Sequence, residues 1–143
     1  MTLLSLAPCL QDGVPASSVT ATGVSVEGGG TALNVAYSLS TINTCQDTIS
    51  NVQFTASEIY TCPAGCTQQS DVKPISAEGV PSSIGQGIIA MGSPTDVVYC
   101  MQTDANGGQT PTVPSSLTVT FWPQGVQNGN EVQGTSKTLN VYP

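Results

Sequence analysis

Glycine and proline interrupt this chain so often that long helices are excluded. The 143 residues include 15 Gly and 10 Pro, and both residue types are costly inside a helix. Between these interruptions the chain is rich in threonine, valine and serine. Because β-branched residues favour the pleated surface of a strand, we expect strands joined by turns, with little helix.

Three segments alternate between apolar and polar residues with the two-residue period of a half-buried strand. They are residues 33–39, 52–60 and 117–122. In the second segment we expect a change of face at Glu58, where a charged residue falls on an apolar position. The dipeptide Asn128-Gly129 follows the third segment, and this dipeptide favours a tight hairpin turn.

Weaker strand patterns lie elsewhere in the chain. Residues 19–26 form one such pattern, with a bulge predicted at Gly23, where the apolar positions change parity. Residues 84–91 and 96–102 form the others, and Leu139 and Val141 make a last strand. About seven or eight short strands with frequent turns predict a single antiparallel β-sandwich, either immunoglobulin-like or jelly-roll.

We assign this sandwich to residues 15–143 and an N-terminal arm to residues 1–14. The arm begins with the apolar run Met1–Leu10. This run is too short to span a bilayer and lacks the basic residues of a secretory signal. Leucines of the arm are the candidate assembly contacts: Leu3, Leu4, Leu6 and Leu10.

Charged residues are scarce and mostly acidic. They make up 8% of the chain, with nine acids against Lys73 and Lys137, for a formal net charge of -7. The absence of His and Arg excludes an imidazole base, a His metal ligand and a guanidinium clamp. Two lysines are too few to neutralise several phosphates, so nucleic acid is not an expected partner.

The five cysteines are the most unusual residues of the chain, and their odd number leaves at least one without an intramolecular partner. Cys62 and Cys66 could close a local loop. Cys45 and Cys100 are spaced like the inter-sheet pair of immunoglobulin domains. These four are the candidate disulfide cysteines and Cys9 stays unassigned, although a buried free thiol at Cys100 is an alternative.

Catalytic and metal sites are not indicated. Zinc ligands typically come in two close pairs, whereas Cys45 and Cys100 are single, and a thiol without any His lacks an obvious base. The acids are scattered rather than grouped as a glycosidase pair. Asp104 and Asn106 alternate like the start of a calcium loop but lack the later acidic ligands, which favours a plain turn. We predict no enzyme activity, no cofactor and no metal.

Trp122 is the aromatic residue that the alternation places away from the core. It has the opposite parity to Phe121 and precedes Pro123, so we expect it to contact a partner or to pack under a loop. As the single tryptophan, it lies outside the segment between Cys45 and Cys100. The likeness to immunoglobulin domains is therefore one of architecture.

A sandwich with this uncharged, hydroxyl-rich composition resembles virion accessory proteins, such as capsid decoration or cement proteins and the domains of tails and fibres. The resemblance is architectural, covers the whole chain and has no diagnostic motif. It implies a virion protein that self-associates as a symmetric oligomer such as a trimer. It also implies binding to the major capsid protein or a neighbouring structural subunit, with the arm and residues 139–143 as clamps.

Two alternatives stay open. A secreted filament or cell-surface subunit that donates its N-terminal strand would explain the cysteines better, since disulfides persist outside the cytoplasm. A carbohydrate-binding module or small hydrolase would need an exposed row of aromatic residues or two facing carboxylates.

Overall fold

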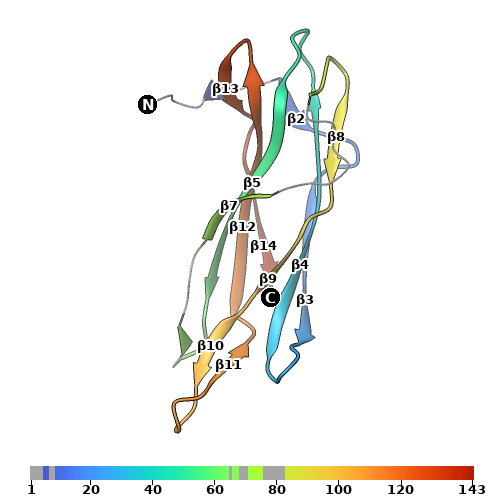
Figure 1. Cartoon of the computed structure of the whole chain (residues 1–143). Coiled ribbons are helices and arrows are strands. Elements are labelled where there is room, and N and C mark those ends of the chain that lie inside the picture. Colours follow the sequence, from blue (N-terminus) through green and yellow to red (C-terminus); the bar gives the residue numbers. More distant parts are fainter. Residues whose placement is uncertain (1–4, 7–8, 65, 68–70, 76–82) are drawn as a thin grey trace.

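The computed structural model describes residues 5–6, 9–64, 66–67, 71–75 and 83–143. These ranges contain strands and turns and no helix, and the long strands are antiparallel. The prediction of an all-β sandwich is therefore confirmed. The molecule is elongated, with β2, β8 and β13 towards one end and β10 and β11 at the other (Figure 1).

The strands, in chain order, are β1 (Ser5–Leu6), β2 (Leu10–Asp12), β3 (Ser18–Ser25), β4 (Thr31–Asn43), β5 (Ser50–Thr61), β6 (Cys66–Thr67), β7 (Asp71–Ile75), β8 (Ile89–Gly92), β9 (Thr95–Val98), β10 (Cys100–Thr103), β11 (Gln109–Thr112), β12 (Ser116–Gln127), β13 (Asn130–Gln133) and β14 (Lys137–Tyr142).

The first large sheet is centred on β4. On one side β3 pairs with the first part of β4, and β2 pairs with the last part. On the other side, β9 pairs with the first part of β4 and β8 pairs with the last part. On each side of β4, two short strands therefore lie end to end with a short break between them. Strand β4 itself runs the full length of the sheet.

The second large sheet is centred on β12. Strand β5 pairs along one side of β12, and β7 pairs with β5. On the other side of β12, β14 and β13 follow one another, and β1 adds to β13 in parallel. The predicted Asn128-Gly129 hairpin is confirmed, because it joins β12 to β13 with φ angles of 53° and 80°.

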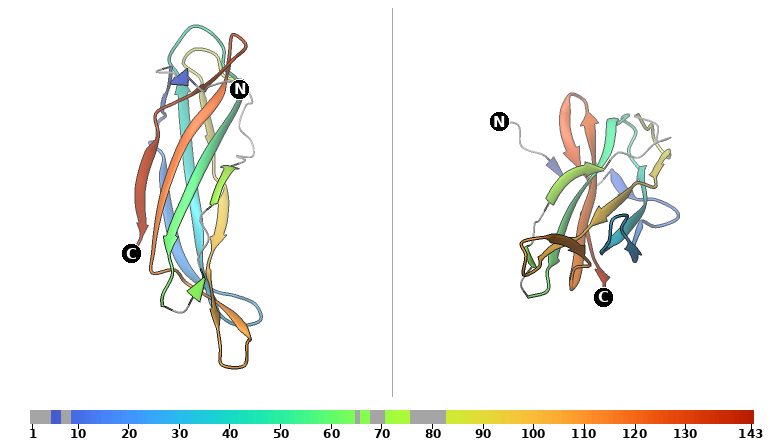
Figure 2. Two further views of the ribbon diagram at one scale, coloured as in Figure 1. Left: turned by 90° about the vertical axis from the view of Figure 1, so that its left-hand side faces the viewer. Right: turned by 60° about the horizontal axis from the view of Figure 1, so that its bottom comes forward.

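A third, smaller sheet of β6, β10 and β11 lies at the lower end of the molecule (Figure 1). The two further views show that the long strands of both large sheets run along the same length of the molecule (Figure 2). The space between the large sheets holds the main core.

Apolar side chains fill that space because the two-residue period points them inward from both sheets. The main core cluster is drawn chiefly from β4, β5 and β12. Its fully or nearly fully buried members include Leu33, Val35, Tyr37, Leu39, Phe54, Ala56, Leu117, Val119 and Phe121. A second cluster consists of Leu10, Ile49, Ile84, Ala90 and Val132.

Three details differ from the sequence predictions. Gly23 pairs with Leu33 in unbroken register, so the predicted bulge is wrong. The predicted change of face at Glu58 is also wrong, because Glu58 is buried and Ile59 is 54% exposed. The central strands are not short, since β4 has 13 residues and β5 and β12 have 12 each. The breaks occur in the edge strands instead.

Candidate interaction surfaces and a lateral cleft

The outward face of β5, β12 and β14 carries no charged side chain. Register pairs Ser57 with Thr120 and Thr120 with Thr138, and the two threonine hydroxyls lie 2.9 Å apart. The outward positions are Gln53, Thr55, Ser57, Ile59 and Thr61 of β5, Ser116, Thr118, Thr120, Trp122 and Gln124 of β12, and Thr138 and Asn140 of β14. We call this surface the Trp122 face.

The outward face of β3, β4 and β9 is also free of charge. Val97 is 53% exposed and pairs with Asn34, which in turn pairs with Thr22. The outward positions are Ser18, Thr20, Thr22 and Val24 of β3, Ala32, Asn34, Ala36 and Ser38 of β4, and Thr95 and Val97 of β9. We call this surface the Val97 face.

The acidic side chains that the structure describes lie elsewhere. Some are in turns and loops, two are on the short strands β2 and β13, and others point between the sheets. In that order they are Glu27, Asp47 and Asp104, then Asp12 and Glu131, then Glu58 and Asp96. A chain with a formal charge of -7 therefore keeps the listed positions of the Trp122 face and the Val97 face free of charge.

Trp122 lies on the outer face, as the alternation predicts, and is half-buried there. Its indole Nε1 donates to Oε1 of Gln124 at 3.3 Å, and the hydroxyl of Thr55 donates to the same oxygen at 3.1 Å. These contacts hold the ring against its neighbours on the sheet. Whether it contacts a partner stays a prediction.

Glu58 and Tyr37 form a polar contact inside the main core. Glu58 is 1% exposed, and its Oε2 accepts a hydrogen bond of 2.5 Å from the Tyr37 hydroxyl. Burial, this hydrogen bond and the nearby charges of Glu58 and Asp96 raise the pKa of Tyr37 far above its ordinary value of 10.0. This contact was not predicted from the sequence, because the carboxylate on an apolar position indicated a change of face.

Two disulfides form, but both candidate pairings from the sequence are wrong. Cys9 pairs with Cys45, and Cys62 pairs with Cys100, with Cα–Cα distances of 5.1 and 5.9 Å. Cys66 is free and half-buried. The Cys9–Cys45 bond forms because β2 and β4 pair at this end of the sheet and bring together the residues that flank them. The spacing of the cysteines along the chain does not show that β2 and β4 pair in this register.

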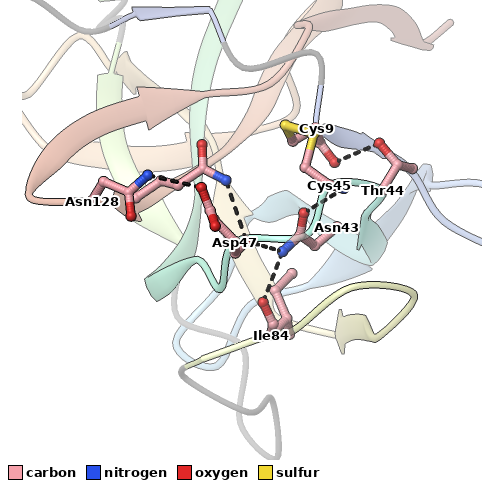
Figure 3. Close-up of a disulfide and its surroundings, with 8 residues drawn as sticks. Cys9, Asn43, Thr44, Cys45, Asp47, Ile84 and Asn128 are labelled. Carbon is pink, nitrogen blue, oxygen red and sulfur yellow. Dashed lines mark hydrogen bonds between the residues drawn. A yellow bond between two sulfur atoms is a disulfide. The ribbon is translucent and has the colours of Figure 1, made fainter.

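Hydrogen bonds surround the Cys9–Cys45 disulfide (Figure 3). The side-chain amide of Asn43 donates to the carbonyls of Asp47 and Ile84 at 2.8 and 3.0 Å. Its Oδ1 accepts from the backbone N–H of Cys45 at 3.0 Å. Asn43 is fully buried, and these three bonds to backbone groups satisfy its side-chain amide.

The predicted arm is partly built into the domain. Leu10 is 1% exposed in the second core cluster, so the prediction that it is an assembly contact is wrong. Leu6 belongs to β1, which pairs with β13. Leu3 and Leu4 lie outside the described residues, and their role stays a prediction.

A cavity of about 300 Å³, which we call the lateral cleft, opens where the β2/β3 break faces the β13/β14 break. Lys137 donates from Nζ to the Ser17 carbonyl at 3.0 Å and lies 3.7 Å from Asp12 Oδ2. The lining residues are Leu10, Gln11, Asp12, Ser17, Ser40, Phe54, Phe121, Pro123, Thr135, Ser136 and Lys137. This site was not predictable from the sequence, because no local pattern reveals that two distant strand breaks meet.

The Asp104 segment is a turn between β10 and β11. The carboxylate Oδ1 of Asp104 accepts from the backbone N–H groups of Asn106 and Gly108 at 2.9 and 2.8 Å. These bonds close the turn. Over the described ranges, no group of three or more Cys, Asp or Glu is placed to hold a metal ion.

Comparisons with known proteins do not assign a family to the chain. No protein-family model matches it, and no curated protein matches it significantly in sequence. Within the part of the chain that the structure describes, no helix is long and apolar enough to cross a membrane.

Proposed function

We propose that this protein is a non-enzymatic structural subunit of a virus particle: a capsid decoration or cement subunit, or a tail or fibre subunit. The observation that carries the proposal is the pair of uncharged sheet faces on an acidic chain. Such a subunit binds its neighbours through broad flat surfaces rather than through a reactive centre.

Charge decides where copies of an acidic protein can meet. Apposed like charges at an interface cost several kcal/mol, and the chain has a formal charge of -7. Contacts through the Trp122 face or the Val97 face bring no carboxylate of those faces against another. The hydroxyl and amide groups of both faces can hydrogen-bond to a neighbour, and Trp122, Ile59 and Val97 supply apolar contacts.

The disulfides are equally compatible with a second candidate, a subunit of an extracellular filament or cell surface. Two of them form in this chain, and disulfides persist in secreted proteins and on virions and cell surfaces. Both candidates assemble through the same faces. They differ in the object to which the protein belongs.

Particle fractionation distinguishes the two candidates. Particles released by the cells that make the protein are separated on a density gradient, and each fraction is analysed by mass spectrometry and electron microscopy. A virion subunit co-sediments with capsids at a fixed ratio to the major capsid protein. Recovery with fibres supports the second candidate, and recovery only as free protein contradicts both.

A further inference from the structure

We propose that β3 is an interaction edge at which two copies of this chain pair, with β3 of one copy running antiparallel to β3 of the other. The two sheets centred on β4 then form one continuous sheet across the dimer. This inference goes beyond the proposed function, because it concerns a strand edge rather than a sheet face. It holds whether or not the protein belongs to a virus particle.

Strand β3 is paired on one side only. In the described part of the chain it pairs with β4 along its whole length and with no other strand. Strand β14 of the other sheet contacts β3 but pairs with β12. Figure 1 shows β3 at the outer edge of its sheet, beside β4. Because alternate residues of an antiparallel strand point both N–H and C=O away from the partner, β3 presents a row of backbone groups that β4 does not pair.

The other described edge strands of the two large sheets carry features that oppose strand addition. Natural proteins protect such edges with short strands, charged residues, prolines or bulges. Strand β7 contains Asp71, Lys73 and Pro74, and β9 contains Asp96. Strand β14 contains Lys137 and pairs with β12 through a register shift. The remaining edge strands have two to four residues each, and they are β1, β2, β8 and β13.

Strand β3 has none of these features. Its eight residues, SVTATGVS, include no charged residue and no proline, and its register with β4 is unbroken. Valine and threonine occupy half of its positions, and both favour strands. A long uncharged edge of this kind is a template for another strand.

Charge selects a second copy of β3 as the partner. The chain has a formal charge of -7, and apposed like charges at a contact are costly. Pairing β3 with β3 brings no charged side chain of either strand into the contact. It also covers the unprotected edge of both copies at once, so the contact closes as a two-fold dimer and does not propagate.

The side-chain pattern of β3 fits this two-fold pairing. We place the axis at Thr22, so that Thr20 of one copy lies opposite Val24 of the other. Cross-strand pairs of β-branched residues stabilise antiparallel strands. On the inward side, Ala21 lies opposite Gly23, and the space beside Gly23 is open. Small residues therefore meet where the two sandwiches come together.

Sedimentation equilibrium of the full chain over a concentration series tests the edge. Gly23→Lys places a charge at an inward position of the edge strand, which is a natural protection against strand addition. It also lowers the net negative charge, so weaker association would not come from general repulsion. We expect it to weaken the dimer by about tenfold or more. The controls Gly23→Ala, which fits the open space, and Thr103→Lys, at an exposed position on β10, should leave the dimer unchanged. Circular dichroism shows whether each variant is folded.

Cysteine cross-linking in a Cys66→Ser background identifies the strand and its register. Thr22→Cys faces its own copy across the axis, so oxidation with diamide, which takes up the two electrons of the thiol pair, should give a disulfide-linked dimer. In Val24→Cys the two thiols are offset by four residues, or roughly 13 Å along the strands. That offset is too long for a disulfide, so Val24→Cys should cross-link far more slowly.

Three outcomes would overturn the proposal. They are a chain that stays monomeric at every concentration, a dimer that Gly23→Lys leaves intact, and equal cross-linking of Thr22→Cys and Val24→Cys. A dimer that Gly23→Lys leaves intact but Thr120→Glu dissociates would overturn edge pairing and retain the contact through the Trp122 face. Edge pairing and the proposed function therefore fail separately.

Discussion

Among single residues, Tyr37 makes a polar contact inside the main core. Its side chain is 2% exposed, and its hydroxyl donates to a carboxylate that is 1% exposed. A buried carboxylate is costly unless hydrogen bonds satisfy it. Loss of this hydrogen bond would therefore leave a buried carboxylate with one partner fewer and lower the free energy of unfolding.

Replacing Tyr37 with phenylalanine removes the hydroxyl group that donates to Glu58 and keeps the aromatic ring. We expect Tyr37→Phe to lower the free energy of unfolding by about 1–3 kcal/mol. Tyr99, which is 45% exposed, provides the matched control, and Tyr99→Phe should change stability by less than about 0.5 kcal/mol. Urea unfolding followed by circular dichroism measures both, and equal effects would contradict the role given to Tyr37.

Alkaline pH should weaken the fold through the same residue. The pKa of Tyr37 is raised in the folded protein, so an unfolded tyrosine loses its proton above pH about 10 while the folded one keeps it. The unfolded state then binds fewer protons, and the free energy of unfolding falls as pH rises. We expect this fall to be smaller in Tyr37→Phe. Urea midpoints between pH about 8 and 11, measured in a Cys66→Ser background that prevents disulfide exchange, test it.

Among the elements, the broken edge strands depend on glycines that allow close packing. A Cβ at Gly134 would lie 2.6 Å from the Leu10 carbonyl oxygen and 2.8 Å from Pro123 Cγ. Gly134→Ala should therefore cost about 1–3 kcal/mol. Gly23 has open space around it, so Gly23→Ala should be neutral or slightly stabilising. Thermal unfolding of the two variants measures the contrast, and a harmless Gly134→Ala would refute the packing argument.

The Cys9–Cys45 disulfide closes a loop across a sequence separation of 36 residues. Loop-closure entropy predicts that the Cys9→Ser, Cys45→Ser double variant loses about 4 kcal/mol of stability. Cys66 is free, and Cys66→Ser should cost less than about 1 kcal/mol. Guanidinium unfolding compares them, and a double variant as stable as Cys66→Ser would show that the bond is absent in solution.

The elements also show how far sequence reasoning reaches. The strands β4, β5 and β12 and the Asn128-Gly129 turn were predictable, because the side-chain period and turn chemistry are local. The disulfide pairing was not, because it follows from which strands are neighbours. Glu58 was misplaced because a buried carboxylate breaks the apolar pattern, and its partner Tyr37 lies on another strand. The lateral cleft was not predictable either, because it forms where the β2/β3 break faces the β13/β14 break, and no local sequence pattern shows that these segments meet.

For the whole molecule, the distribution of charge is the feature that bears on function. The Trp122 face and the Val97 face are neutral, while the acids that the structure describes lie in turns, on β2 and β13, or between the sheets. We infer that these faces are where copies or neighbouring subunits meet. Adding a negative charge to one of them should therefore weaken association more than the same charge placed elsewhere.

Sedimentation equilibrium over a concentration series tests this central claim most directly. The unmodified chain should form a defined oligomer of its 14.6 kDa subunit. Either Thr120→Glu on the Trp122 face or Thr22→Glu on the Val97 face should weaken that association by about tenfold or more. Thr103→Glu, at an exposed position on β10, should have no effect. A chain that stays monomeric at every concentration, or an oligomer that both face variants leave intact, would contradict the account.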